Sequence, residues 1–234
     1  MAVRLDGALV AVREGDPSRA HATRLPGDLL RVLEESGAAL RDVTLLAVGL
    51  GPGAFTGLRV GLAAMQGLAF ATKLPVVGVS GLEALAVQAA RGPGVTGDVV
   101  IGIWIDGARA EVFAARYRVD PSSATGVAGI DEPLAAPPPV VLDAWTADAR
   151  MPTVWIGSGA ALYESLLRER GALPQGVLPW APLAPTIGEL AERSFAAGVQ
   201  ASPHALRPLY VRRPDAELAR DRGRSPRVES ETRP

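Results

Sequence analysis

Cysteine is absent from this 234-residue chain, and histidine occurs only twice, as His21 and His204. Without cysteine the chain has neither a disulfide framework nor a thiolate metal site. No Ser-His-Asp set can be proposed from the spacing, and Gly157-Ser158-Gly159 lacks the Gly-x-Ser-x-Gly pattern of a nucleophile elbow. We therefore predict no metal site and assign no catalytic residue.

A surplus of basic residues is missing too. Lys and Arg number 24 against 25 Asp and Glu, which gives a net charge of −1 and an isoelectric point near 6.2. Because neutralised phosphates supply most of the affinity of nucleic-acid-binding proteins, we predict no unaided binding of nucleic acid. A signal peptide and long uncharged apolar runs are also lacking. We expect a cytoplasmic protein without a membrane span.

What the chain does contain, over residues 1–94, is an alternation of strand and helix patterns. Apolar stretches on both sides of Asp6-Gly7 predict a β-hairpin, since this dipeptide tolerates positive φ. Short apolar runs predict strands, and apolar residues three and four apart predict helices. The expected elements cover residues 2–5, 8–12, 24–37, 44–50, 56–72, 75–79 and 82–90. This order predicts an α/β protein with a parallel or mixed sheet.

Gly92-Pro93-Gly94 is the best candidate for a boundary between two lobes. We predict a first lobe over residues 1–94 and a second over 95–210. The second lobe is expected to hold a hairpin around Asp106-Gly107, a loop over 121–139, a strand over 153–156 and helices over 160–170 and 187–198. Residues 211–234 are dominated by Arg, Asp, Glu and Pro, and we predict a flexible C-terminal tail.

The most informative stretch is residues 49–70, in which a glycine-rich loop leads from a strand into a helix. A helix N-terminus attracts anions, so a phosphate loop is one interpretation. The stretch lacks the Gly-Lys-Ser/Thr of a Walker A loop, and Thr56 stands where a dinucleotide-binding loop has a small residue. We therefore do not assign phosphate binding to this loop.

Three glycines lie inside the predicted helix, at Gly57, Gly61 and Gly67. Together they weaken it by roughly 3 kcal/mol relative to alanine, so some contact must offset this cost. A smooth stripe of small residues lets another backbone come close. The approaching surface is either the protein's own sheet or a helix of a second subunit, with Met65 filling gaps. Both interpretations stay open, because a helix has two sides.

Residues 49–61, Gly-Leu-Gly-Pro-Gly-Ala-Phe-Thr-Gly-Leu-Arg-Val-Gly, resemble the signature of the TsaB (YeaZ) family, which has Ser where this chain has Ala54. Shorter stretches at 21–25, 79–86, 106–113 and 208–212 also resemble family motifs, and together they span residues 2–213. The resemblance implies the two-lobed fold of actin, sugar kinases and Hsp70 ATPases, with ribonuclease-H-like lobes. The family's usual first strand, ending in Asp-Thr-Ser/Ala, has no counterpart here, and a start codon assigned too late is the expected explanation.

The resemblance also implies a function. Members of this family are non-catalytic scaffold subunits of the complex that transfers threonylcarbamoyl to N6 of the adenosine 3′ of the tRNA anticodon. They pair with the catalytic subunit TsaD through first-lobe helices and associate with TsaE, while tRNA is contacted only indirectly; a homodimer is a further possibility. No cofactor is expected. The implied partner interface comprises Leu29, Val32, Leu33, Gly57, Leu58, Gly61, Leu62, Met65 and Leu68.

Three features bear on an alternative function, an active ATP-dependent kinase, ATPase or glycoprotease-like hydrolase of the same fold. Gly157, Ser158 and Gly159 follow a strand and precede a helix, as a phosphate loop would, although a simple turn with Ser158 as the N-cap is the plainer interpretation. The arginine of the family's Asp-Ala-Arg motif aligns with Ala108 of this chain. Arg109 is one position further on, and on a strand a shift of one residue puts the side chain on the opposite face. We therefore do not assign the family arginine's role to Arg109. Asp106 and Glu111 are expected to be solvent-exposed around the turn.

Overall fold

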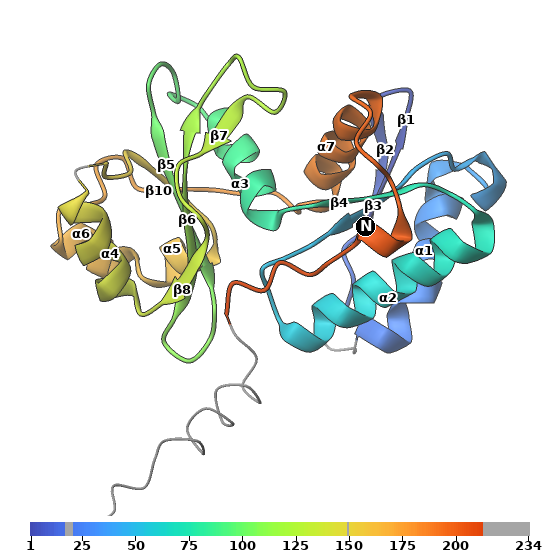
Figure 1. The fold of residues 1–234 in the computed structure, drawn as a ribbon, viewed down its shortest axis with the longest axis horizontal. Coiled ribbons are helices and arrows are strands. Elements are labelled where there is room, and N and C mark those ends of the chain that lie inside the picture. The colour runs from blue at the N-terminus through green and yellow to red at the C-terminus, as the bar shows by residue number, and fades with distance from the viewer. Residues whose placement is uncertain (17–20, 149, 213–234) are drawn as a thin grey trace, which may run out of the picture.

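The computed structural model of the chain describes residues 1–16, 21–148 and 150–212, with no side-chain description for residues 21–23. Most of the predicted tail, residues 213–234, therefore lies outside the described residues. Figure 1 shows two lobes side by side, one built around β1 to β4 and the other around β5 to β10. This arrangement agrees with the predicted two-lobed α/β class.

The chain begins with the predicted hairpin. β1 (Ala2–Leu5) pairs antiparallel with β2 (Ala8–Val12). The turn between them uses Asp6 at φ 49° and Gly7 at φ 77°, both in the left-handed region. Asp-Gly was expected here because these residues adopt that region at low cost. The hairpin prediction is confirmed.

A βαβ unit follows the first helix. α1 (His21–Ser36) leads through a short 3₁₀ turn (Leu40–Asp42) to β3 (Leu46–Gly49). α2 (Phe55–Thr72) then crosses to β4 (Val76–Val79), which pairs in parallel with β3. α2 lies beside α1, and its inner side covers β3 and β4. A core cluster of apolar residues fills the space between them.

The first-lobe strands form two separate sheets of two strands each, β1-β2 and β3-β4. α7 (Ala184–Ala196) contacts strands of both sheets. Over β1, Arg4 Nε donates to Glu192 Oε1 at 3.1 Å, and over β3, Ile187 approaches Gly49. One helix thus bridges two unpaired sheet edges. The absence of the family's usual first strand, the one that ends in Asp-Thr-Ser/Ala, stays a prediction.

The second lobe is built on a six-stranded mixed sheet. Its strand order is β10-β9-β5-β6-β7, and β8 also pairs with β6. The bounds are β5 (Val100–Asp106), β6 (Val112–Val119), β7 (Val127–Gly129), β8 (Leu134–Ala136), β9 (Val154–Ile156) and β10 (Val177–Leu178). The hairpin predicted around Asp106-Gly107 is confirmed by β5 and β6. The predicted loop over 121–139 instead contains β7 and β8, which are too short and too irregular in pattern to be recognised from sequence.

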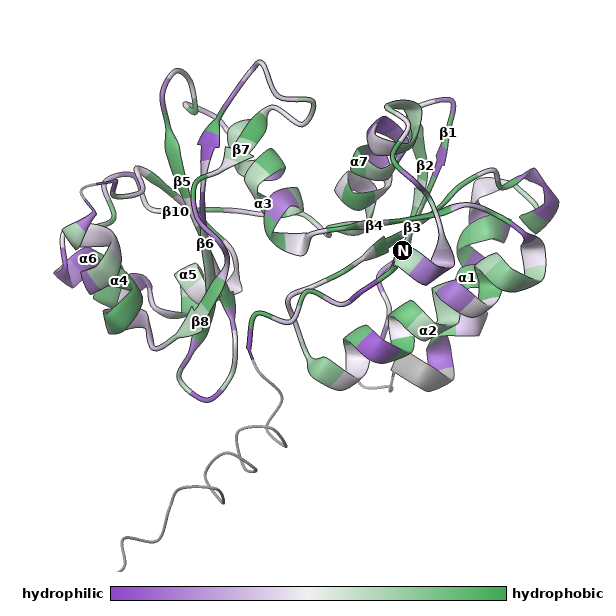
Figure 2. Ribbon diagram, viewed as in Figure 1, coloured by the Kyte–Doolittle hydropathy of each residue, from purple (hydrophilic) through white to green (hydrophobic). Residues whose placement is uncertain are grey.

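Helices cover both faces of this sheet (Figure 1). α3 (Gly81–Ala90) packs on one face, and α4 (Pro138–Ala147), α5 (Ser158–Leu162) and α6 (Glu164–Glu169) lie on the other. Figure 2 shows hydrophobic residues concentrated in β5 and α3, as expected for elements buried on several sides. The helix expected over residues 160–170 is two short helices, which meet at Tyr163.

The helices α3 and α7 connect the two lobes. α3 packs on the second-lobe sheet and also contacts α7, which lies on the first-lobe strands. Arg91, the C-cap residue of α3, makes a two-pronged ion pair with Glu189 of α7, with N–O distances of 2.8 and 2.6 Å. Gln88 exchanges two hydrogen bonds with the backbone of Ala181. The boundary at residue 94 stays a prediction.

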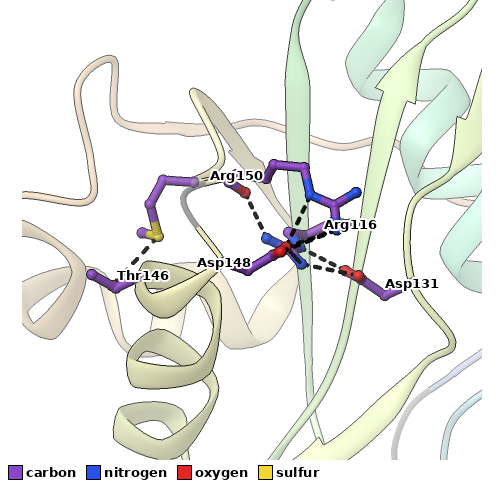
Figure 3. Close-up of polar contacts among 6 residues, drawn as sticks. Arg116, Asp131, Thr146, Asp148 and Arg150 are labelled. Atoms are coloured by element: carbon purple, nitrogen blue, oxygen red, sulfur yellow. Dashed lines mark hydrogen bonds and ion pairs between the residues drawn. The ribbon is translucent and has the colours of Figure 1, made fainter.

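The core of the second lobe encloses the charged side chain of Arg116 on β6, which is 3% exposed. Its Nε and Nη2 atoms donate to both oxygens of Asp131 at 2.6 and 2.9 Å, and Nη2 also donates to Asp148 at 2.6 Å (Figure 3). The Arg150 carbonyl accepts a further bond, and the Trp145 ring lies 5.2 Å away. These contacts satisfy the guanidinium and tie the end of α4 to β6.

Candidate interaction face of the first lobe

α2 presents one exposed side to solvent. Phe55, Arg59, Ala63, Gly67 and Phe70 are all exposed and recur at intervals of three or four residues, so they share one side of the helix. We call these five residues the α2 face. Arg59 is the one ionisable residue in α2, and the other residues of this helix are uncharged. A face of this composition suits contact with another protein.

Three residues of the predicted partner interface lie inside the protein's own core. Val32 is 2% exposed, Leu62 4% and Met65 9%. Leu62 and Met65 pack in one cluster with residues of β3 and β4. The prediction for these three residues is corrected: all three are buried within this chain, and the β3-β4 sheet covers Leu62 and Met65, so these side chains are not available to a partner.

The other six predicted interface residues are half-buried. They are Leu29, Leu33, Gly57, Leu58, Gly61 and Leu68. Sequence reasoning missed Leu30 of α1, which is 61% exposed, as well as the exposed aromatic residues at the two ends of α2. The helical period was the sequence signal that could have identified the exposed side of α2. It puts Ala63 and Gly67 on the side of the helix opposite the buried residues Leu62 and Met65.

The glycines of the region serve different purposes. A Cβ atom built on Gly61 or Gly67 would meet no atom within 4 Å, so packing among the described residues does not require glycine at either position. By contrast, Gly51 has φ 93°, and a Cβ there would lie 2.7 Å from Leu58. Its carbonyl accepts a 2.7 Å bond from the Gly81 amide. The loop glycine is thus explained by its positive φ and by the Leu58 side chain beside it, whereas packing explains neither Gly61 nor Gly67.

The Gly157-Ser158-Gly159 loop packs tightly against β5. A Cβ on Gly157 would lie 2.5 Å from the Trp104 carbonyl, and one on Gly159 would lie 2.9 Å from the Ile105 carbonyl carbon. Gly157, not Ser158, is the N-cap of α5, which corrects that part of the prediction. The Ser158 hydroxyl instead accepts a 3.1 Å bond from the Asp106 amide. Close contact with the strand accounts for both glycines.

The turn between β5 and β6 contains Ala108, which aligns with the family's arginine, and Arg109, which follows it. Ala108, Arg109 and Ala110 have φ of 56°, 56° and 58°, so three consecutive residues are left-handed. The expectation that Arg109 lies on a strand is wrong, because the turn covers it and strand alternation does not apply. Asp106 is exposed as predicted, and Glu111 is half-buried and forms an ion pair with Arg212.

A half-buried carboxyl, that of Glu83, lies in the first turn of α3. Burial raises the pKa of Glu83, and a hydrogen bond with Thr125 acts in the opposite direction. Burial together with the nearby Glu83 charge raises the pKa of Tyr117 to about 12, against a smaller opposing effect of Ser80. Ser80 is the N-cap of α3 and accepts a 3.4 Å bond from the Glu83 amide. Ser80, Glu83 and Tyr117 thus connect the start of α3 to β6.

An open cleft of about 620 Å³ lies beside the N-terminus and is lined by Met1, Arg13, Arg24, Trp180 and neighbouring residues. Arg13 and Arg24 both bond to Asp28, at 3.4 and 3.0 Å. Burial raises the pKa of Asp28, but the two arginines outweigh it and hold that pKa below its usual value. The two cations of the cleft are thus directed at a carboxylate of α1.

Within the described part of the chain, no group of three or more His, Cys, Asp or Glu residues could hold a metal ion. His204 packs edge-on to Phe70, with ring centroids 5.0 Å apart. The side chain of His21 lies outside the described residues. Among those residues, no helix is long and apolar enough to cross a membrane.

Comparison with known proteins identifies relatives over most of the chain. The family profile "TsaD: tRNA N6-adenosine threonylcarbamoyltransferase" matches residues 15–132. The Escherichia coli tRNA threonylcarbamoyladenosine biosynthesis protein TsaB is 31% identical over 207 residues, which cover 88% of this chain and 87% of that protein. Its Haemophilus influenzae namesake is 49% identical over 71 residues, 30% of each chain.

Solved structures give the same relationship. A Pseudomonas aeruginosa protein, described as uncharacterized with similarity to peptidase YEAZ, superposes with a TM-score of 0.69. It is 31% identical and covers 90% of this chain, and the match covers 93% of its own chain. The likeness therefore extends across both lobes.

Proposed function

The chain belongs to the TsaB (YeaZ) family of tRNA threonylcarbamoyladenosine biosynthesis proteins, and from this premise we propose that it is a non-catalytic scaffold subunit. In this role it pairs with a threonylcarbamoyltransferase of the TsaD family and supports the transferase's active conformation. The complex acts in the cytoplasm, includes the ATPase TsaE, and holds tRNA mainly through its other subunits.

The observation that carries the proposal is the open space over Gly67, which shares the α2 face with Ala63; the Cβ position of Gly61, on another side of the helix, is open as well. Each glycine weakens α2 by about 1 kcal/mol, and no described atom comes close enough to gain from the missing side chain. A second helix crossing at Ala63 and Gly67 would gain from it, because small residues let two helix backbones approach closely. The half-buried residues of the predicted interface, such as Leu29 and Leu68, border this crossing.

Pairing is tested by co-expression with the transferase of the same organism, with Ala63→Arg as the decisive variant. Ala63 is exposed, so the substitution leaves the fold intact while its long charged side chain blocks the crossing. We expect co-purification to be lost and tRNA modification by the reconstituted complex to fall with it. Val140→Arg is the matched control, since Val140 is 55% exposed on α4 of the other lobe. Normal pairing by Ala63→Arg would remove the α2 face from the interface.

The second candidate, an active ATP-dependent or hydrolytic enzyme, is favoured by the description of the P. aeruginosa relative as similar to a peptidase. It requires a nucleotide or a substrate bound to this chain alone. Calorimetric titration of the isolated protein with Mg-ATP separates the two functions. Tight, magnesium-dependent binding of ATP would favour the enzyme. If the chain is a scaffold, we expect no heat of ATP binding until the transferase is added.

A further inference from the structure

Arg59 is held in place by two aromatic rings at the N-terminal end of α2. Its guanidinium carbon lies 3.8 Å from the centre of the Phe55 ring and 5.8 Å from that of Tyr210. Its Nε donates a 2.8 Å hydrogen bond to the Tyr210 hydroxyl. The two rings also contact each other, with centroids 5.5 Å apart. Phe55 and Arg59 are one helical turn apart, so one side of this cluster is set by the helix itself.

The other side of the cluster comes from a segment 151 positions away in the sequence. This segment is fixed to the lobe at several points before it reaches Tyr210. Leu206 is buried in the first-lobe core, and Gln66 Nε2 donates to the Pro203 carbonyl at 2.9 Å. The Leu209 amide donates to the Leu50 carbonyl at 2.8 Å. Tyr210 is therefore a fixed partner for Arg59.

The charge of Arg59 is not matched within the described part of the chain. Its contacts there are the Phe55 ring, the Tyr210 ring and the Tyr210 hydroxyl, and no carboxylate is among them. Arg4, Arg91 and Arg116, by contrast, each pair with a carboxylate. The Tyr210 hydroxyl takes the Nε position, and no hydrogen bond or ion pair with a described residue occupies the two Nη groups of Arg59, which leaves them as donors for a carboxylate.

We propose that Arg59 is the charged anchor of the α2 face and binds an aspartate or glutamate on the partner's helix. The inference rests on the proposed function and specifies the chemistry of the partner. An arginine already ordered by stacking and a hydrogen bond loses little side-chain freedom on binding, which is typical of residues that dominate an interface. Burial beneath the partner strengthens the ion pair by excluding water.

The geometry also says where the carboxylate lies. Ala63 is four residues from Arg59, which is about 6 Å along the helix axis. A partner helix that crosses over Ala63 and Gly67 therefore carries its small residue at the crossing and its acidic residue about one turn away. The acidic residue is on the side that faces Phe55 and Tyr210. This placement limits the candidates to a few positions on the partner.

The test is a titration of the purified transferase against Arg59→Glu and Arg59→Gln, with dissociation constants measured at two salt concentrations. We expect Arg59→Glu to weaken pairing by at least about 30-fold. The wild-type pair should weaken with added salt, whereas the Arg59→Gln pair should respond less. Reversing the facing acidic residue of the partner to Lys should restore binding to Arg59→Glu. Tyr210→Phe, which keeps the ring and loses the hydroxyl, should weaken pairing by only a few-fold.

Ala63→Arg separates the two levels of the argument. If Ala63→Arg abolishes pairing and both Arg59 variants pair within twofold of wild type, the anchor is refuted while the scaffold function stands. If neither Ala63→Arg nor the Arg59 variants weaken pairing, both the Arg59 anchor and the role of the α2 face in the scaffold function are refuted. Melting curves by circular dichroism establish that each variant is folded. If Arg59→Glu proves unfolded, the Arg59→Gln affinity and its salt response decide the question.

Discussion

Replacing Gly67 by alanine should stabilise the isolated protein while weakening its complex. Gly67 lies in the interior of α2 and has helical backbone geometry, since its φ is not among the positive values. A Cβ atom added there meets nothing within 4 Å, so no strain opposes the higher helix propensity of alanine. The expected gain in the free energy of unfolding is about 0.5–1 kcal/mol. For a chain of this size, that raises the melting temperature by roughly 1–4 °C.

The assay is thermal unfolding of the isolated protein followed by titration with the transferase. The added methyl group should keep the partner's backbone from its closest approach and weaken pairing by several-fold. Gly157→Ala is the control, because Gly157 has φ 107° and its Cβ would lie 2.5 Å from the Trp104 carbonyl. That variant should be destabilised and should not affect pairing of the folded fraction. A Gly67→Ala variant that melts lower than wild type would refute the assignment of Gly67 to an open face.

Three further predictions concern the fold. Met65→Arg should lower the free energy of unfolding by about 3–5 kcal/mol and yield an unstable protein in chemical denaturation, because it inserts a charge into the first-lobe core. Arg116→Met should cost about 2 kcal/mol in the same assay, since it removes charged hydrogen bonds to Asp131 and Asp148; an unchanged midpoint would contradict this. Glu83→Gln should flatten the pH dependence of stability. Burial raises the pKa of Glu83 above its ordinary 4.5, so its contribution is full below 4.5 and is lost as the pH rises through the raised pKa. If wild type and Glu83→Gln respond identically to pH, Glu83 does not control this region.

The sequence identified the family and most of the regular elements. The stretch from Gly49 to Gly61 is long and specific, and the relatives confirm the family that it indicated. Hairpins at Asp6-Gly7 and Asp106-Gly107 could be predicted because turn chemistry depends on two adjacent residues. Strands of three residues, such as β7 and β8, could not be predicted, since a period of two is not recognisable over so short a run.

The exposed side of the helix pair was harder to predict. The composition of α2 indicated two stripes, but both apolar and small residues can face either a sheet or a partner. Only the packing of Leu62 and Met65 against β3 and β4 showed which side is internal. The exposure of Leu30 was missed because its neighbours Leu29 and Val32 form an equally good apolar pattern. The structure shows that the side of α1 that carries Val32 is the buried one.

Local chemistry, then, was determined by the sequence alone: the turns, the glycine content of α2 and the family to which the chain belongs. The tertiary structure decided which side of α2 is open, and it brought Tyr210 beside Arg59 across 151 positions. The physical reason is that helix and turn preferences depend on neighbours along the chain. Exposure, and the pairing of a charge, depend on which distant segments fold against it.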